Sequence, residues 1–329
     1  MTAAIPPALD AVAPAYGLRP AGLPVPAGDR VWRLPAAGGD VAVKLYGAGQ
    51  QARAEKEAAI LAHLQARSGV DYRVQALLRT VDGDALWRGA NAQALVTRWD
   101  AGAMRSYDSY SPAEWRALGA SLAALHRRLD SLALPGQETL GARLRALDAG
   151  AARRDLAADA ARAAGRPGAA ELQDYAASCL RILDDCHPGS LADFPADDPQ
   201  RPIHNDYNQF NYLFGATLPP LILDWEASIG APREYEVVRC LNHLPLESPE
   251  LAQAFVGAYL RLRPLRAARM AWAVDAACLQ QALKRWVVQG WLDDPARYGA
   301  HLQGARRMAG MMAGARGRLI DFFTRCARS

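Results

Sequence analysis

Four polar residues in the second half of the chain have the types and spacing of a catalytic and metal-binding set. The stretch PIHNDYNQFNYLF contains His204, Asp206 and, five residues after the aspartate, Asn211. Thirteen residues later, Asp224 ends the apolar run PPLILD, which is typical of a buried strand. Oxygen-rich, thiol-free groups suit hard divalent cations such as Mg²⁺, which such groups usually share with phosphate oxygens.

A lysine far upstream falls on one face of a predicted strand. Residues 31–46, VWRLPAAGGDVAVKLY, predict two strands joined by a turn, because AAGGD separates two β-rich runs. By period two, the second strand places Lys44 on one face and three apolar residues on the other: Val41, Val43 and Leu45.

The next segment, QARAEKEAAILAHLQA, predicts a helix. Its apolar stripe contains Ile60, Leu61 and Leu64, and Glu57 lies on the same inward face. A carboxylate that faces a core needs a partner, so Glu57 is expected to pair with a cation.

The remaining elements predict an α+β chain in two parts. YRVQALLRTVDG and DALWRGANAQALVTRW resemble strands, and SPAEWRALGASLAALHRRL predicts a helix with a capping box over Ser111–Glu114. The Ala- and Arg-rich stretch 140–170 predicts exposed helices and a loop, and the chain after Pro232 is expected to be helical. We expect a mostly β part over residues 1–99 and a helical part over 100–329.

Composition limits the classes of function. The 329 residues are 51% hydrophobic and 22% charged, and the net charge of +4 comes from interspersed charges, which does not favour nucleic acid binding. Five cysteines without CxxC spacing favour buried, reduced thiols over a disulfide or zinc framework. Without a signal-like N-terminus or a long apolar run, we expect a cytoplasmic protein with no membrane partner.

Taken in order, a strand lysine, a helix glutamate, H-x-D-x-x-x-x-N and a strand-end aspartate follow the plan of kinases. The wording of HNDYNQFNYLF, LILDWEASIGAPREYEVVR and LGASLAALH resembles the aminoglycoside phosphotransferase and choline kinase superfamily. The similarity runs from about Gly28 to Arg239. It implies a two-lobed protein-kinase-like fold, with a small antiparallel-sheet N-lobe for the nucleotide and a large, mainly helical C-lobe for catalysis and the acceptor.

The resemblance also implies roles for the polar residues of the second half. Asp206 would be the catalytic residue that accepts the proton of an acceptor hydroxyl and orients it. His204 would support the catalytic loop through hydrogen bonds. Asn211 and Asp224 would hold magnesium between the β- and γ-phosphates.

The nucleotide-binding roles fall in the first half. Lys44 would contact the α- and β-phosphates and pair with Glu57, and adenine would meet backbone groups near Thr97 to Trp99. No G-x-G-x-x-G precedes the lysine, so residues 28–30, beginning with Gly28, either cradle the phosphates or form a plain hairpin turn. The nucleotide is expected to be ATP, with GTP left open.

The predicted function is therefore ATP- and Mg-dependent transfer of a phosphoryl group to a hydroxyl of a small molecule. An amino alcohol, a homoserine-like compound, a sugar and an aminoglycoside all remain open as the acceptor, and so does the oligomeric state. Trp272, Trp286 and Trp291 could line an acceptor pocket or belong to the core.

Two alternatives are a nucleotide-binding pseudokinase and a protein kinase. Against a pseudokinase, none of the catalytic positions is lost. Against a protein kinase, only eleven residues separate Asp224 from Glu236, which leaves no room for a long activation segment. Asn205 also stands where many regulated protein kinases have arginine.

Overall fold

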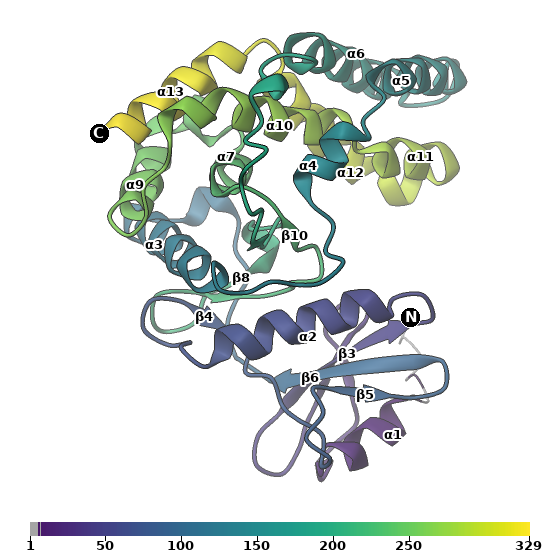
Figure 1. The fold of residues 1–329 in the computed structure, drawn as a ribbon. Helices are drawn as coiled ribbons and strands as arrows, with labels where there is room; N and C mark the ends of the chain where they lie inside the picture. Colours follow the sequence, from purple (N-terminus) through teal and green to yellow (C-terminus); the bar gives the residue numbers. More distant parts are fainter. Residues whose placement is uncertain (1–5, 7) are drawn as a thin grey trace. The chain divides into compact units, whose positions relative to one another are not determined.

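The computed structural model describes Pro6 and residues 8–329, which fall into two compact units. The first unit contains the described residues up to Pro135 together with His204–Ser228, and the second contains Gly136–Ile203 and Ile229–Ser329. The first unit holds a small antiparallel sheet and the second is mainly helical, which confirms the α+β expectation (Figure 1). The lobe boundary near residue 99 stays a prediction.

The sheet of the first unit consists of five strands among the described residues. Their spatial order is β1 (Val25–Pro26), β2 (Val31–Leu34), β3 (Val41–Gly47), β6 (Ala92–Arg98) and β5 (Leu86–Arg88). β2 and β3 are the two strands predicted over residues 31–46, and Val31 pairs with Lys44 across them. Their turn contains Gly38 and Gly39 at φ 95° and 114°, a backbone region that glycine adopts without steric cost.

β3 presents different residues to the two faces of this sheet. Val41, Val43 and Leu45 pack with α1 (Ala8–Ala15) in one apolar cluster, as the period of two predicts. Lys44 lies on the opposite face, where its side chain donates to Glu57 of α2 (Gln51–Gln65).

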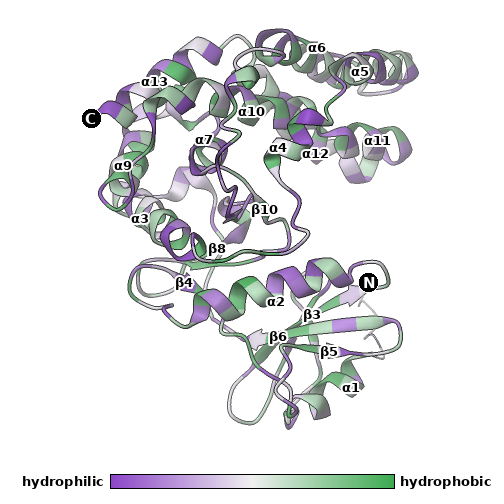
Figure 2. Cartoon of the chain, viewed as in Figure 1, coloured by the Kyte–Doolittle hydropathy of each residue, from purple (hydrophilic) through white to green (hydrophobic). Residues whose placement is uncertain are grey.

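α2 carries a carboxylate on its buried side. Its buried residues are Ala54, Glu57, Ala58, Ile60, Leu61 and Leu64, so the predicted inward position of the glutamate is confirmed. Figure 2 shows hydrophobic and hydrophilic residues alternating around this helix, as expected where one side meets a sheet and the other solvent.

A smaller sheet positions the end of the apolar run. β8 (Tyr212–Leu213) pairs antiparallel with β9 (Leu221–Ile222), and β9 pairs in parallel with β4 (Arg73–Val74). Asp224 follows β9 by two residues with φ 59°. This left-handed backbone region is uncommon outside glycine, although aspartate adopts it more readily than most residues.

α3 (Pro112–Leu129) begins at the predicted capping box. The Ser111 hydroxyl accepts from the Glu114 N–H, and the Glu114 carboxylate accepts from the Ser111 N–H at 2.7 Å. Three leucines on one side of this helix are buried: Leu118, Leu122 and Leu125.

The second unit is built from helices and one short strand pair, β7 (Pro202–Ile203) with β10 (Ile229–Gly230). Its helices are α4 (Leu140–Arg145), α5 (Ala149–Ala163), α6 (Ala169–Cys186), α7 (Arg233–Leu241), α8 (Leu244–Glu247), α9 (Pro249–Leu260), α10 (Met270–Ala282), α11 (Arg285–Asp293), α12 (Pro295–Met312) and α13 (Arg316–Arg328). The helical course after Pro232 is therefore as predicted.

Two of the three tryptophans that could have lined an acceptor pocket, and most of the cysteines, are buried in the second unit. Trp272 and Trp291 are buried, whereas Trp286 is 56% exposed. All five cysteines are free, and four of them are buried. Within the described residues, no helix has both the length and the apolar character needed to cross a bilayer.

Candidate active site

The Asp206 side chain is held on both carboxylate oxygens. Asn208 Nδ2 donates to Asp206 Oδ1 at 2.8 Å, and Asn211 Nδ2 donates to Asp206 Oδ2 at 2.9 Å. Asn211 Nδ2 also donates to the Asp206 carbonyl at 2.9 Å. Two asparagines of HNDYNQFN therefore hold this carboxylate in place.

His204 links this loop to the segment that carries Asp224. Its Nδ1 accepts from the Asp206 backbone N–H at 3.2 Å, and its Nε2 lies 2.8 Å from the Leu223 carbonyl oxygen. Because a backbone N–H donates and a carbonyl accepts, this pattern assigns the proton of the neutral ring to Nε2. The imidazole is buried, so the structure places it as a support between two loop segments.

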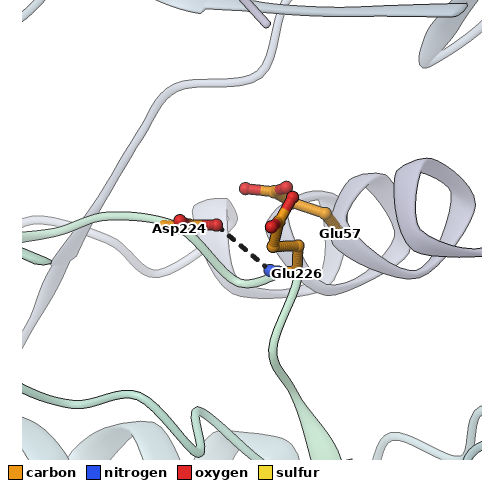
Figure 3. Close-up of side chains that lie close together, drawn as sticks. All are labelled: Glu57, Asp224 and Glu226. Atoms are coloured by element: carbon orange, nitrogen blue, oxygen red, sulfur yellow. Dashed lines mark hydrogen bonds between the residues drawn. The ribbon is translucent and has the colours of Figure 1, made fainter. Parts of the chain in front are cut away.

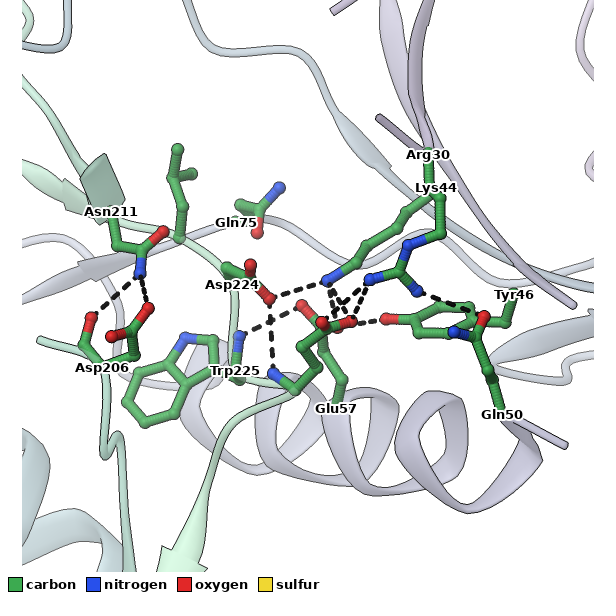
Figure 4. A network of polar contacts seen from close by, with 12 residues as sticks. Arg30, Lys44, Tyr46, Gln50, Glu57, Gln75, Asp206, Asn211, Asp224 and Trp225 are labelled. Atoms are coloured by element: carbon green, nitrogen blue, oxygen red, sulfur yellow. Dashed lines mark hydrogen bonds and ion pairs between the residues drawn. The ribbon is translucent and has the colours of Figure 1, made fainter. Parts of the chain in front are cut away.

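The lysine and the glutamate predicted to pair do so across the sheet and α2. Lys44 Nζ lies 2.7 Å from Glu57 Oε2 and 2.8 Å from Asp224 Oδ1 (Figure 4). Glu57 also accepts from the Tyr46 hydroxyl and, through Oε1, from the Trp225 N–H at 3.2 Å. The Glu57 carboxylate therefore has three donors, which compensate for burial that leaves 1% of its side chain exposed.

The charged groups of this cluster shift one another's pKa values. Burial would lower the pKa of Lys44, but the carboxylates of Glu57 and Asp224 outweigh burial and raise it. Burial would raise the pKa of Asp224, but the Lys44 ammonium outweighs burial and lowers it. Burial raises the pKa of Glu57 although Lys44 opposes the rise, and burial together with Glu57 raises the pKa of Tyr46. Lys44 and Tyr46 therefore remain donors at neutral pH.

A third carboxylate, Glu226, joins the cluster. Oxygens of Glu57, Asp224 and Glu226 all lie within 4.8 Å of one another (Figure 3). Glu226 Oε2 lies 3.2 Å from Lys44 Nζ, so the lysine contacts all three acids. Arg30 Nη2 donates to both oxygens of Glu226 at 2.8 and 2.9 Å, which brings a second cation to the same group.

A cavity of about 560 Å³ lies within the first unit and is lined in part by Lys44, Glu57 and Asp224. This volume is typical of small-molecule sites. Polar residues in its lining include Arg30, Lys44, Glu57, Asn211 and Asp224. Its apolar lining includes Val31, Ala42, Met104, Phe210, Leu213, Leu221 and Leu223. A charged group beside an apolar wall suits a ligand that combines an anionic part with a flat or apolar part.

The structure places the predicted nucleotide residues differently with respect to this cavity. Gly28 and Trp99 line it, whereas Thr97 is buried and accepts at Oγ1 from Gln75 Nε2 at 3.2 Å. The Trp99 N–H donates to the Asp40 carbonyl at 3.0 Å, so that donor is already used within the sheet. Of the predicted site residues, all of which the structure describes, three do not line the cavity: Thr97, His204 and Asp206.

The predicted metal ligands both reach the cavity. Asn211 uses its amide nitrogen on Asp206, and Figure 4 shows its amide oxygen pointing away from that aspartate. Asp224 receives Lys44 and the Glu226 N–H through Oδ1 alone, and 42% of its side chain is exposed. An amide oxygen and a carboxylate on one cavity fit the oxygen ligand set of a hard divalent cation.

Sequence reasoning did not single out Glu226 or Tyr46 as site residues, and it named Arg30 only as the end of the loop 28–30. Glu226 stands two residues after Asp224 in the DWE triplet, and this spacing was the available signal. Tyr46 shares the face of β3 with Lys44 by period two. Arg30 had no signal beyond its place before a strand, because its partner is 196 residues away.

Several solved structures share the fold of this chain. The chain is similar to the solved structure of a spectinomycin phosphotransferase in complex with ADP and spectinomycin, with a TM-score of 0.69 and 11% identity over 93% of this chain and 97% of that chain. An aminoglycoside phosphotransferase from Alicyclobacillus acidocaldarius gives a TM-score of 0.66 and 17% identity over 100% of this chain and 98% of that chain. A microcompartment-associated aminopropanol kinase gives a TM-score of 0.56 and 18% identity over 94% of this chain and 93% of that chain.

At these identities the solved structures show the fold, which is that of protein-kinase-like phosphotransferases. A search of curated protein sequences finds no significant match. The family model described as the phosphotransferase enzyme family matches residues 22–272, well over half of the chain. The expected resemblance is thereby confirmed, and the chain belongs to the phosphotransferase enzyme family.

Proposed function

We propose that this phosphotransferase moves the γ-phosphoryl group of ATP, with magnesium, to a hydroxyl of a small-molecule acceptor. One observation carries the proposal: Lys44, Glu57, Asn211 and Asp224 converge on one cavity of the first unit, and Asn211 also holds the Asp206 carboxylate. Phosphoryl transfer depends mainly on positioning and charge neutralisation, and this set provides both.

Each residue has one task in this proposal. Asp206 accepts the hydrogen bond of the acceptor hydroxyl and takes up its proton, while Asn208 and Asn211 keep the carboxylate oriented. Lys44, held by Glu57, binds the α- and β-phosphates. Asn211 and Asp224 would hold magnesium, which neutralises charge on the phosphates when bound.

The neighbouring structures favour a small, hydroxyl-bearing acceptor. Spectinomycin is bound in one of them, and another is named as an aminopropanol kinase. Both names describe compounds that combine hydroxyl and amino groups, so amino alcohols and aminoglycosides are the first acceptors to test. ATP is the proposed donor, and GTP should be compared with it directly.

The test is release of ADP from ATP and Mg²⁺ across a panel of amino alcohols, amino acids, sugars and aminoglycosides. We expect one acceptor class to stimulate release, and Asp206→Ala to abolish the stimulation while retaining nucleotide binding. Nucleotide binding without turnover on any acceptor would favour a pseudokinase. Phosphorylated polypeptide without a small acceptor would favour a protein kinase.

A further inference from the structure

The loop before β2 has few means of holding phosphates through its backbone. It contains Gly28 alone, whose φ lies outside the left-handed region that anion-binding backbone nests require. The Ala27 N–H donates to the Val31 carbonyl at 2.8 Å, and the Val31 N–H points back to the Gly28 carbonyl at 3.5 Å. Two of its donors are thus used inside the loop.

A side chain of the same loop is held at the cavity instead. Arg30 lines the cavity, and its side chain is 33% exposed. Glu226 accepts two bonds from Nη2 at 2.8 and 2.9 Å, and Gln50 Oε1 accepts one from Nη1 at 3.3 Å. The guanidinium also lies 5.5 Å from the centre of the Tyr46 ring. The backbone of Arg30 is fixed as well, because its carbonyl accepts from the Leu45 N–H at 2.9 Å.

This arrangement leaves donors for an anion. A guanidinium carries five N–H groups in a rigid fork, and the contacts with Glu226 and Gln50 use at most three of them. At least two groups remain, and these suit phosphate oxygens, which arginine binds with matching geometry.

The charge of the cluster indicates why a second cation is needed. Lys44 Nζ contacts Glu57, Asp224 and Glu226 at 2.7 to 3.2 Å, so one ammonium already serves three carboxylates. A triphosphate entering the same cavity adds several negative charges. Among the described residues, Lys44 and Arg30 are the cations that form ion pairs with these carboxylates, and Arg30 pairs with Glu226 alone.

We propose that Arg30 binds the β- and γ-phosphates of the nucleotide in place of a glycine-rich backbone cradle, with Glu226 and Gln50 as its positioning residues. The inference rests on the proposed function, because it requires a nucleoside triphosphate in this cavity. It resolves the alternative left open by the sequence, since the loop acts through an arginine side chain and its turn need not wrap the phosphates.

The experiment is calorimetric titration of the full-length protein with ATP, ADP and AMP in the presence of Mg²⁺. Arg30→Met keeps most of the side-chain stem and removes the charge, and Arg30→Lys keeps the charge without the fork. The matched control is Arg88→Ala, an exposed arginine of β5 that pairs with Glu55 at 3.6 Å and lies outside the cavity lining.

We expect Arg30→Met to weaken ATP binding roughly 10- to 100-fold, as for the loss of charge-assisted hydrogen bonds. AMP affinity should change about twofold or less, Arg30→Lys should lie between wild type and Arg30→Met, and the control should match wild type. ADP reports whether the β-phosphate shares the contact.

Three outcomes would overturn the inference. Unchanged ATP affinity in Arg30→Met would show that the arginine does not touch the phosphates. Equal losses for ATP, ADP and AMP would show that it only supports the fold of the loop. Either result leaves the proposed function standing, whereas a wild-type protein that binds none of the three nucleotides would overturn both.

Discussion

Replacing Lys44 with methionine should destabilise the first unit through the acid left behind. The Glu57 side chain is 1% exposed, and Lys44 is the cation that neutralises it at 2.7 Å. Removing one partner of a buried ion pair costs about 3–5 kcal/mol. Glu57 keeps the Tyr46 hydroxyl and the Trp225 N–H as donors, so we expect the lower end of that range, about 3 kcal/mol.

The penalty should shrink as pH falls. Without its cation, Glu57 has a folded-state pKa raised further above the unfolded value of about 4.3, so its unfavourable effect fades as it protonates towards low pH. In the wild type, Lys44 lowers the pKa of Asp224, and that stabilising contribution is lost as pH falls through the lowered pKa. The Glu57 effect reduces the difference between the two proteins from pH 8 to pH 5, whereas the Asp224 effect acts only below the ordinary aspartate pKa of about 4.

Native-state hydrogen exchange of the β3 and α2 amides is the appropriate assay, because it reports on the first unit separately from the second. We expect protection in Lys44→Met to fall roughly 100-fold at pH 7, the equivalent of about 3 kcal/mol. Lys44→Met with Glu57→Gln should recover part of this loss. Unchanged protection in the single variant, or no recovery in the double variant, would refute the reasoning.

Three further changes test other parts of the structure. Gly102→Ala would place a Cβ 2.7 Å from the Phe214 carbonyl oxygen, a backbone clash that should destabilise the protein by about 1–3 kcal/mol in thermal melts. Asp224→Asn should abolish the Mg²⁺ dependence of ATP binding in titrations, whereas Mg²⁺-dependent binding equal to wild type would exclude it as a metal ligand. Ser111→Ala removes the hydroxyl that caps α3 at the Glu114 N–H and should cost about 1 kcal/mol of stability in urea unfolding.

Short-range patterns predicted the elements and the main polar residues. Period two in β3 separated Lys44 from its apolar neighbours, and the helical phase of α2 put Glu57 inward. The cost of burying a charge required a cation for the inward Glu57, and the resemblance named Lys44 as that cation. The order of Asp206 and Asn211 then indicated the chemistry.

Contacts between distant segments were beyond those patterns. β4 pairs in parallel with β9. Each of these strands has only two residues, which is too short for an alternating pattern to indicate which residues pair. Arg30 meets Glu226 across 196 residues, which periodicity within either segment does not encode. The prediction that adenine meets backbone groups near Thr97 to Trp99 rested on the resemblance and stays a prediction, and the buried Thr97 side chain accepts a hydrogen bond from Gln75.

The most direct test of the central claim is ³¹P NMR of a reaction with ATP, Mg²⁺ and the acceptor selected by the panel. Wild-type protein should convert ATP to ADP with an equal amount of a phosphomonoester on the acceptor, and Asp206→Asn should give neither product at a comparable rate. Inorganic phosphate without phosphomonoester, or the same phosphomonoester rate from Asp206→Asn, would contradict the account.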